Sequence, residues 1–193
     1  MNKATIGYVE TLDFVASEAI NTICSNLSFA GKDIKKILFS SFSATAGKSF
    51  VTKQILWNLA KRGRRAVLVD TDLRRSTLLG DTGFKSTKAE EIKGLAHYLA
   101  GYCELDDALY ETDIAHSVIM PIGRAIKNPV ALLGSQRFQE MLDILADEFD
   151  NVIIDTPPIG LVIDAAEIAK YSDGAVIVIE YDQTTRRELI TMR

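Results

Sequence analysis

The sequence predicts an α/β fold with a doubly wound, mostly parallel sheet and helices on both of its faces. Short apolar runs alternate with amphipathic stretches from residue 14 onward, and β-α alternation of this kind builds a parallel sheet. Several runs are apolar throughout, as expected of strands that are covered on both faces. The 193 residues include 47% hydrophobic and 25% charged residues, which suits one domain with a full core.

The first half of the chain supplies a helix, a strand, a second helix and a second strand. Apolar residues recur at helical spacing over 13–29, which predicts an amphipathic helix. The second helix is expected to end at Gly63, which is free to adopt a left-handed cap. The expected elements, in chain order, are a helix over 13–29, a strand over 36–41, a helix from Lys48 to about Arg62, and a strand over 66–70.

The second half begins with residues 74–93, which are polar and irregular and predict a surface loop. The elements expected after it are short helices over 94–100 and 105–110, a strand over 118–121, helical segments from Asn128 and over 135–149, a strand over 151–155, a helix over 164–171, a strand over 175–180, and a helix over 184–192. Doubly wound folds usually continue with another strand, so we expect a sheet that is shortened at its C-terminal end.

The bulk properties exclude several classes of protein. A net charge of −4 argues against nucleic acid as the main partner. Cys24 and Cys103 are far apart and predict reduced thiols in a cytoplasmic protein. No apolar run approaches the ~18–20 residues that a spanning helix needs. If the protein works at a membrane, we expect a partner to hold it there.

Acidic side chains follow two of the predicted strands. Asp70 ends the apolar run over 66–70 and Asp72 follows two residues later, while Asp155 ends the run over 151–155. Binding sites of open α/β sheets lie at the carboxyl edge of the strands. Carboxylates gathered there indicate a metal ion or a proton to be abstracted. An apolar site alone does not stabilise a charged carboxylate.

A phosphate-binding turn is predicted between the strand over 36–41 and the following helix. Ala46-Gly47-Lys48-Ser49 matches the second half of the P-loop pattern, while Phe42 stands where that pattern begins with glycine. Backbone N–H groups and the helix N-terminus would bind phosphate oxygens. Lys48 would neutralise the β- and γ-phosphates, and the Ser49 hydroxyl would bind Mg²⁺. The sequence therefore predicts a P-loop nucleotide-binding fold, and the chain resembles the MinD/ParA-like branch of such folds.

With these motifs placed, nearly the whole chain resembles the cytoplasmic kinase domain of the bacterial tyrosine kinases that regulate capsular and exopolysaccharide synthesis. In that family a Walker A′ strand of the form Asp-x-Asp-x-Arg follows the P-loop, as Asp70, Asp72 and Arg74 do here. A Walker B strand ends in Asp-Thr-Pro-Pro, as 155–158 do. Supporting matches are Gly94-Leu95 with Tyr98-Leu99, Asn128-Pro129 with Leu132-Leu133, and Ser135 with Arg137-Phe138.

The resemblance implies an ATP-dependent protein-tyrosine kinase of the autophosphorylating type, with ATP and Mg²⁺ as cofactors. Asp70 or Asp72 would accept the proton of the tyrosine hydroxyl, and both alternatives stay open at this point. The residues that match the family's ATP-binding positions are Thr45, Ala46, Gly47, Lys48, Ser49 and Phe50; those matching its metal ligands are Ser49, Asp70 and Asp155; and those matching its catalytic positions are Lys48, Asp70, Asp72 and Arg74.

The resemblance also implies partners and an organisation. A transmembrane activator, or chain-length regulator, would recruit the cytoplasmic chain to the inner face of the cell membrane, and tyrosine residues of proteins would be its substrates. We expect a single kinase domain over 1–193, with an N-terminal segment and assembly-type helix over 1–30 and a nucleotide-binding core over 36–193. A homo-oligomer is implied, and no nucleic acid is expected.

Departures from the family pattern keep two alternatives open. The family's Glu-x-x-Arg-x-x-Arg assembly helix reads Glu18, Asn21 and Cys24 here, which argues against the usual ring, and no terminal tyrosine cluster is present. A catalytically weakened, nucleotide-binding regulatory subunit is therefore one alternative. The other is a MinD/ParA-type ATPase, a class that places a lysine where Ser43 stands in this chain.

Overall fold

The computed structural model describes residues 1–87 and 91–181. Eight strands form one sheet in the order β4-β1-β5-β6-β3-β7-β2-β8, and its central pairs are parallel. The antiparallel pairs, β1 with β4 and β5 with β6, lie toward one edge. The strands are β1 (Asn2–Thr5), β2 (Lys36–Ser41), β3 (Ala66–Asp70), β4 (Lys85–Ser86), β5 (Tyr110–Thr112), β6 (Ser117–Met120), β7 (Asn151–Asp155) and β8 (Gly174–Val178).

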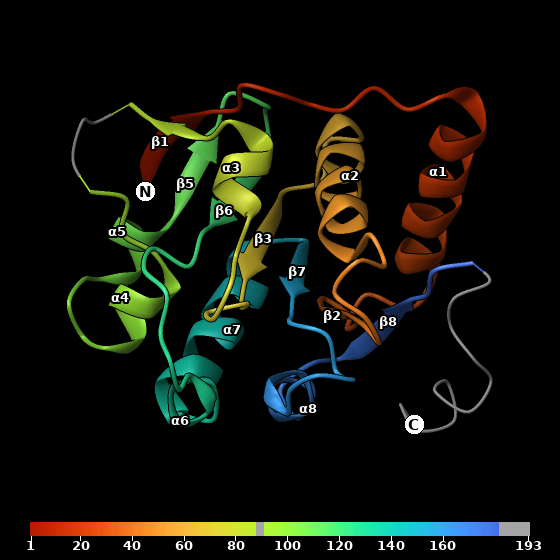
Figure 1. Ribbon diagram of the computed structural model, residues 1–193. Coiled ribbons are helices and arrows are strands. Elements are labelled where there is room, and N and C mark those ends of the chain that lie inside the picture. The colour runs from red at the N-terminus through yellow and green to blue at the C-terminus, as the bar shows by residue number, and fades with distance from the viewer. Residues whose placement is uncertain (88–90, 182–193) are drawn as a thin grey trace.

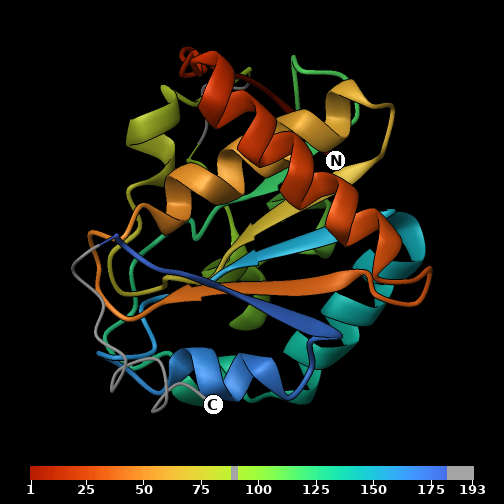
Figure 2. The ribbon, with the colours of Figure 1, turned by 90° about the vertical axis from the view of Figure 1, so that its right-hand side faces the viewer.

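Helices cover both faces of the sheet (Figures 1 and 2). Buried residues of α1 and α2 pack on one face around Phe39 and Leu68, and those of α4, α7 and α8 pack on the other around Val67 and Ile154. The helices are α1 (Phe14–Phe29), α2 (Lys48–Lys61), α3 (Leu78–Thr82), α4 (Leu95–Leu99), α5 (Leu105–Ala108), α6 (Val130–Leu133), α7 (Gln136–Glu148) and α8 (Asp164–Ala169). This confirms the predicted doubly wound, mostly parallel α/β fold.

The strands that carry the motifs were predicted at their observed bounds. β2, β3 and β7 coincide with the runs over 36–41, 66–70 and 151–155, and β3 and β7 are buried along their whole length. Runs without alternating polarity suit strands with helices on both sides. Gly63 has φ 76°, so the chain turns after α2 through the left-handed conformation that the sequence predicted.

Three predictions at the sheet's far edge were wrong. The region over 74–93 is not only a loop, because it contains α3 and β4. The expected helix over 105–110 ends at Ala108, and Tyr110 starts β5. No strand was predicted before residue 13, yet β1 pairs in parallel with β5. From β1 the chain crosses the top of the molecule to α1 (Figure 1), so residues 1–30 supply both a strand of the sheet and a helix that packs on one of its faces.

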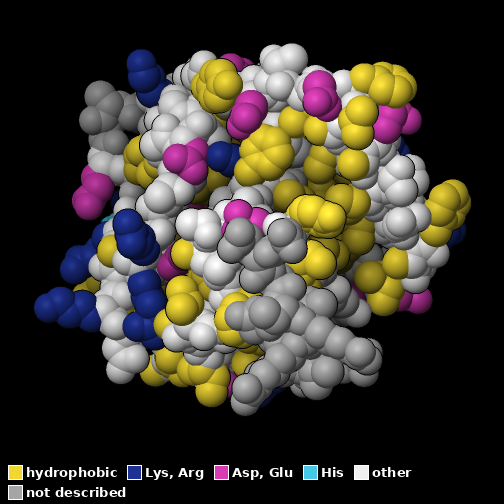
Figure 3. Space-filling model, turned by 45° about the vertical axis from the view of Figure 1, so that its right-hand side comes forward, with side chains coloured by type: hydrophobic (Ala, Val, Ile, Leu, Met, Phe, Trp, Pro, Cys, Tyr) yellow, Lys and Arg dark blue, Asp and Glu magenta, His cyan; other side chains and the backbone are white. Residues whose placement is uncertain are grey.

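The helix α1 has both a buried and an exposed side. At the assembly-motif positions, Cys24 is fully buried, and Asn21 accepts hydrogen bonds from Asn58 and Arg62 of the α2 segment. Phe14 and Phe29 of α1 are 80% and 86% exposed. Hydrophobic side chains gather on this side of the molecule (Figure 3). The assembly role of this helix stays a prediction.

Two further points concern membrane-spanning helices and the helix expected over 184–192. Among the described residues, no helix is both long enough and apolar enough to cross a membrane. The helix expected over 184–192 lies outside the described residues.

Candidate active site

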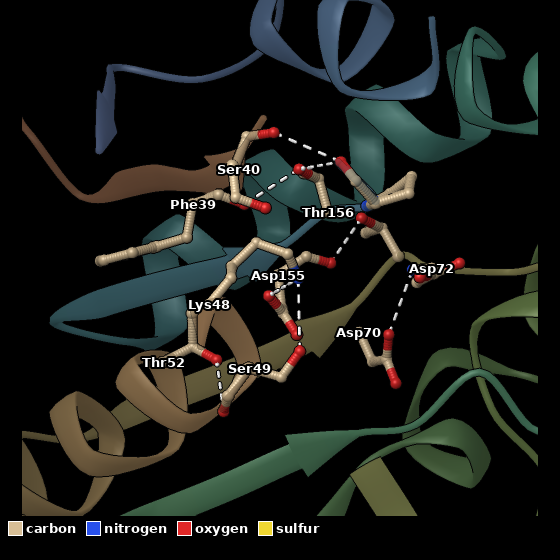
Figure 4. A network of polar contacts seen from close by, with 12 residues as sticks. Phe39, Ser40, Lys48, Ser49, Thr52, Asp70, Asp72, Asp155 and Thr156 are labelled. Carbon is tan, nitrogen blue, oxygen red and sulfur yellow. Dashed lines mark hydrogen bonds and ion pairs between the residues drawn. The ribbon is translucent and has the colours of Figure 1, made fainter. Parts of the chain in front are cut away.

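Three neighbouring strands bring the predicted motifs to one edge of the sheet. β3, β7 and β2 are adjacent in that order, and all three run in parallel. Asp70 and Asp155, the last residues of β3 and β7, are partners in register. The P-loop turn follows β2 at the same edge. The parallel topology therefore places the two carboxylates beside the phosphate-binding turn (Figure 4).

The turn between β2 and α2 has the backbone that a P-loop requires. Gly47 adopts φ 78° and ψ 14° at the N-terminus of α2, a left-handed conformation that a residue with a Cβ rarely takes. The 14-residue helix α2 begins directly after it. Its first N–H groups and its positive dipole end face the turn, as anion binding requires.

The P-loop lysine pairs with the Walker B carboxylate. Lys48 Nζ lies 2.5 Å from Asp155 Oδ1 and 3.3 Å from Ser49 Oγ. The side chains of Lys48 and Asp155 are 7% and 4% exposed. Burial raises the pKa of Asp155, and the Lys48 ammonium opposes that shift. The pair satisfies both buried charges, and a phosphate group entering the turn would compete for the same ammonium.

Asp70 is a buried carboxyl group with two hydrogen-bond donors. The Asp72 backbone N–H donates to its Oδ1 at 3.1 Å, and the Ser76 hydroxyl donates to its Oδ2. Burial, and secondarily the nearby Asp155 carboxylate, raise the pKa of Asp70 to about 7. The two hydrogen bonds and Lys48 act in the opposite direction without cancelling the rise. Two buried acids side by side are therefore poised to be neutralised by a cation.

A cavity of about 320 Å³ opens over these groups. A second one, of about 420 Å³, adjoins it and shares the P-loop residues. The first is lined by Ala44, Thr45, Lys48, Ser49, Asp70, Asp72, Arg75, Ser76, Thr77, Leu78, Asp155 and Pro158. The second adds Glu10, Gly47, Phe50, Lys53 and Asp81. Together they form a hollow that runs from the N-terminus of α2 to the strand-end carboxylates.

Phe42, which replaces the first P-loop glycine, is accommodated by the loop after β7. A Cβ on Gly160 would lie only 2.5 Å from the Phe42 carbonyl oxygen and 2.9 Å from its ring. The close approach is possible because residue 160 has no side chain. The Ile159 N–H also donates to the Ser41 carbonyl oxygen at 2.9 Å, which ties the P-loop to the Walker B loop.

The structure brings together most of the residues that the sequence singled out. Thr45, Gly47, Lys48, Ser49, Phe50, Asp70, Asp72 and Asp155 line the two cavities. Ala46 lies in the turn but lines neither cavity. Arg74 is not brought to the cavity lining, because its guanidinium binds Asp164 instead.

Sequence reasoning missed several lining residues. Arg75, Ser76 and Thr77 follow the Asp-x-Asp-x-Arg motif directly and line the first cavity, and Lys53 lies one helical turn beyond Ser49. Their adjacency to the motifs was the only available signal. His97 is buried at 8% exposed, and its Nδ1 accepts the Gly94 N–H at 3.3 Å.

The oxygen donors at the strand ends suit Mg²⁺. Asp70, Asp155 and the Ser49 hydroxyl supply hard oxygen ligands, and Mg²⁺ typically binds one or two carboxylates together with nucleotide phosphates and water. Within residues 1–87 and 91–181, no cluster of three or more acidic, histidine or cysteine side chains forms an all-protein metal site. The oxygen donors of Ser49, Asp70 and Asp155 fit Mg²⁺ that is bound together with nucleotide phosphates.

Comparison with known proteins agrees with this geometry. Residues 34–189 match an AAA domain family, AAA_31. The tyrosine-protein kinase CpsD of Streptococcus pneumoniae serotype 4 is 37% identical over 92% of this chain and 78% of that protein. The chain belongs to the bacterial tyrosine kinases. The CpsD kinase of Streptococcus agalactiae is 39% identical over 88% of this chain and 72% of that protein.

Solved structures place the kinase in the same family. The kinase domain of the Escherichia coli tyrosine kinase ETK superposes with a TM-score of 0.81 at 25% identity, over 95% of this chain and 74% of that one. The cell-division ATPase MinD of Pyrococcus furiosus gives 0.59 at 27% identity, over 74% of this chain and 58% of that one. The MinD-type ATPases thus share the core of the fold, and the tyrosine kinases share nearly all of it.

Proposed function

We propose that this kinase transfers the γ-phosphoryl group of ATP to tyrosine hydroxyls of proteins that regulate capsular or exopolysaccharide synthesis. The observation that carries the proposal is the register pairing of Asp70 with Asp155 beside Lys48 and Ser49. Simple P-loop proteins need one strand-end acid, whereas a second strand ending in Asp-x-Asp adds both a metal ligand and a candidate base.

ATP would bind with its phosphates at the N-terminus of α2. The backbone of 45–50 and the Lys48 ammonium would hold the β- and γ-phosphates, since the N–H groups of a helix N-terminus favour anions. Binding would draw Lys48 away from Asp155 toward the phosphates. Ser49, Asp70 and Asp155 would hold Mg²⁺, which neutralises charge on the phosphates when it is bound. The MinD of Pyrococcus horikoshii, a fold relative at 25% identity and a TM-score of 0.60, was solved with Mg-ADP.

Asp72 is the better placed of the two candidate bases. Its side chain lines the cavity and is only partly buried, whereas Asp70 is 1% exposed and already accepts two hydrogen bonds. A tyrosine hydroxyl that enters the cavity can reach Asp72 without displacing the buried network. Asp72 would take the hydroxyl proton as the oxygen attacks the γ-phosphorus, and ADP would leave.

We propose further that a transmembrane activator or chain-length regulator recruits the kinase to the inner face of the membrane through its cytoplasmic tail. The support for this proposal is the family resemblance to kinases that lack their own spanning segment. Protein tyrosines would be the substrates. Assembly into a homo-oligomer would have to use contacts other than the arginine motif, because Asn21 and Cys24 occupy its positions.

The test is phosphate transfer in a purified system. The kinase with Mg²⁺ and γ-labelled ATP, supplied with the activator's cytoplasmic tail, should place label on tyrosine. The matched control omits the tail, and the expected result is a lower rate. Measurable ATP affinity without label on any tyrosine would refute kinase activity and favour a regulatory, nucleotide-binding subunit.

A further inference from the structure

The arginine of the Asp-x-Asp-x-Arg motif makes a bidentate ion pair outside the cavity lining. Arg74 Nε donates to Asp164 Oδ2 at 2.9 Å, and Arg74 Nη2 donates to Asp164 Oδ1 at 3.1 Å. The Asp164 side chain is 0% exposed, and that of Arg74 is 33% exposed. Two parallel charge-assisted hydrogen bonds fix both the position and the plane of the guanidinium.

The same guanidinium joins the loops of three adjacent strands. β6, β3 and β7 are neighbours in the sheet, and Arg74 follows the middle one. Asp164 starts α8 after β7, and the Lys127 carbonyl oxygen, which accepts from Arg74 Nη1 at 3.1 Å, belongs to the loop after β6. A backbone bond reinforces this junction, because the Ile126 N–H donates to the Leu73 carbonyl oxygen at 2.7 Å.

The turn that Arg74 anchors is the one that holds the catalytic carboxylates. The Arg75 N–H donates to Asp72 Oδ1 at 3.1 Å, and the Asp72 N–H donates to Asp70 Oδ1 at the same distance. Ser76, two residues beyond Arg74, donates to the other oxygen of Asp70. A displacement of this turn would therefore move Asp72 and change the orientation of Asp70.

We propose that Arg74 is a positioning residue and Asp164 is its anchor: the pair fixes the turn over 70–76 so that Asp70 meets Mg²⁺ and Asp72 meets the tyrosine hydroxyl. The inference rests on the proposed roles of Asp70 and Asp72. It gives Arg74 a role without contact to ATP, and it predicts that Asp164, which touches neither cavity, matters for catalysis as much as Arg74 does.

The variants must avoid leaving a buried charge alone. Removing Arg74 by itself would leave the buried Asp164 carboxylate without its ion-pair partner. An unpaired buried charge destabilises a protein strongly whatever its catalytic role. The double variant Arg74→Met/Asp164→Leu removes both charges, a replacement that is often neutral for stability. Arg74→Lys keeps the charge but loses the bidentate geometry. Lys170→Ala, which breaks an exposed ion pair with Glu167 on the same helix, is the matched control.

Three quantities are measured for each variant: the melting temperature, the ATP affinity with and without Mg²⁺, and the rate of tyrosine phosphorylation at saturating ATP. The double variant should melt near the wild type and bind ATP without Mg²⁺ within about 2-fold, because the P-loop is untouched. The rate should fall about 10- to 100-fold, as expected when catalytic groups shift by about 1 Å, and the Mg²⁺-dependent gain in ATP affinity should shrink. Arg74→Lys should give a rate and a Mg²⁺-dependent gain in ATP affinity between those of the double variant and the wild type. Lys170→Ala should match the wild type in both.

Asp164→Asn separates positioning from direct catalysis. An asparagine keeps only one of the two acceptor oxygens of Asp164, so the proposal expects a rate between that of the double variant and that of the wild type. If Arg74 instead acted directly on phosphate, Asp164→Asn would retain the wild-type rate, and that result would overturn the proposal. A folded double variant that keeps the wild-type rate and the wild-type Mg²⁺-dependent gain in ATP affinity would overturn the proposal as well.

The affinity measurement keeps this inference separate from the proposed function. A wild type that phosphorylates no tyrosine would refute kinase activity. Loss of the Mg²⁺-dependent gain in ATP affinity in the double variant would still support the positioning role of the Arg74–Asp164 pair. If the double variant fails to fold, the Arg74→Lys variant provides the test. A wild-type phosphorylation rate together with a wild-type Mg²⁺-dependent gain in ATP affinity would contradict the inference, and a reduced gain in affinity would support it.

Discussion

Replacing Asp70 by asparagine should stabilise the unliganded kinase, and the gain should grow with pH. Asp70 is 1% exposed, and its pKa is raised from 3.8 to about 7, chiefly by burial and then by Asp155. A group with a raised folded-state pKa holds its proton more tightly in the folded protein than in the unfolded chain. Stability is therefore lost as the pH rises from about 4 to about 7, and the full penalty remains above pH 7.

The size of the effect follows from the shift of about 3 pH units. At 1.36 kcal/mol per unit, the penalty above pH 7 is about 4 kcal/mol. Asparagine cannot ionise, so the free energy of unfolding of Asp70→Asn relative to wild type should increase by up to that amount between pH 4 and pH 8. The substitution also alters the bonds to Ser76 and the Asp72 N–H, but that cost does not depend on pH.

The assay is urea unfolding at a series of pH values in EDTA, so that no divalent cation binds the site. Asp147→Asn is the matched control, because it makes the same Asp-to-Asn change at an exposed position of α7, away from the cavity. A stability difference between Asp70→Asn and wild type that stays constant or falls from pH 4 to pH 8 would refute the account of Asp70 as a buried, cation-seeking carboxyl group.

Two other substitutions test the phosphate-binding turn. Lys48→Met should abolish ATP binding while the far-ultraviolet circular dichroism spectrum remains that of the folded protein, because Asp155 can take up a proton when it loses its partner. Unchanged ATP affinity by titration would contradict the P-loop assignment. Gly160→Ala should destabilise the kinase by about 1–3 kcal/mol in urea unfolding, since its Cβ would lie 2.5 Å from the Phe42 carbonyl oxygen. A loss below about 0.5 kcal/mol would show that the two loops separate easily.

The central strands were predictable from sequence because their burial leaves a continuous apolar signature. β3 and β7 are buried at every residue, so each appears as an uninterrupted run that ends in an acid. The strands β4, β1 and β5, which lie toward one edge of the sheet, have two to four residues each, and their burial is mixed. Such short strands are specified by their pairing partners rather than by their own pattern, and for that reason the sequence did not predict them.

The site was predictable to the extent that its residues lie within motifs. Lys48, Ser49, Asp70 and Asp155 meet because parallel strands end at one edge, which follows from the fold class. The direction of a side chain does not follow from spacing. Arg74 belongs to the motif but points to Asp164, which is 90 positions further along the chain. The tertiary fold, which brings the start of α8 within reach of the turn after β3, determines that choice.

The measurement that tests the central claim most directly is single-turnover phosphotyrosine formation by wild type and Asp72→Asn at saturating Mg-ATP. If the cavity is the phosphoryl-transfer site and Asp72 is the base, the wild type forms phosphotyrosine, and the variant does so about 10²- to 10⁴-fold more slowly with unchanged ATP affinity. Equal rates in the two proteins would contradict the role of Asp72. Absence of phosphotyrosine in both would contradict the kinase itself.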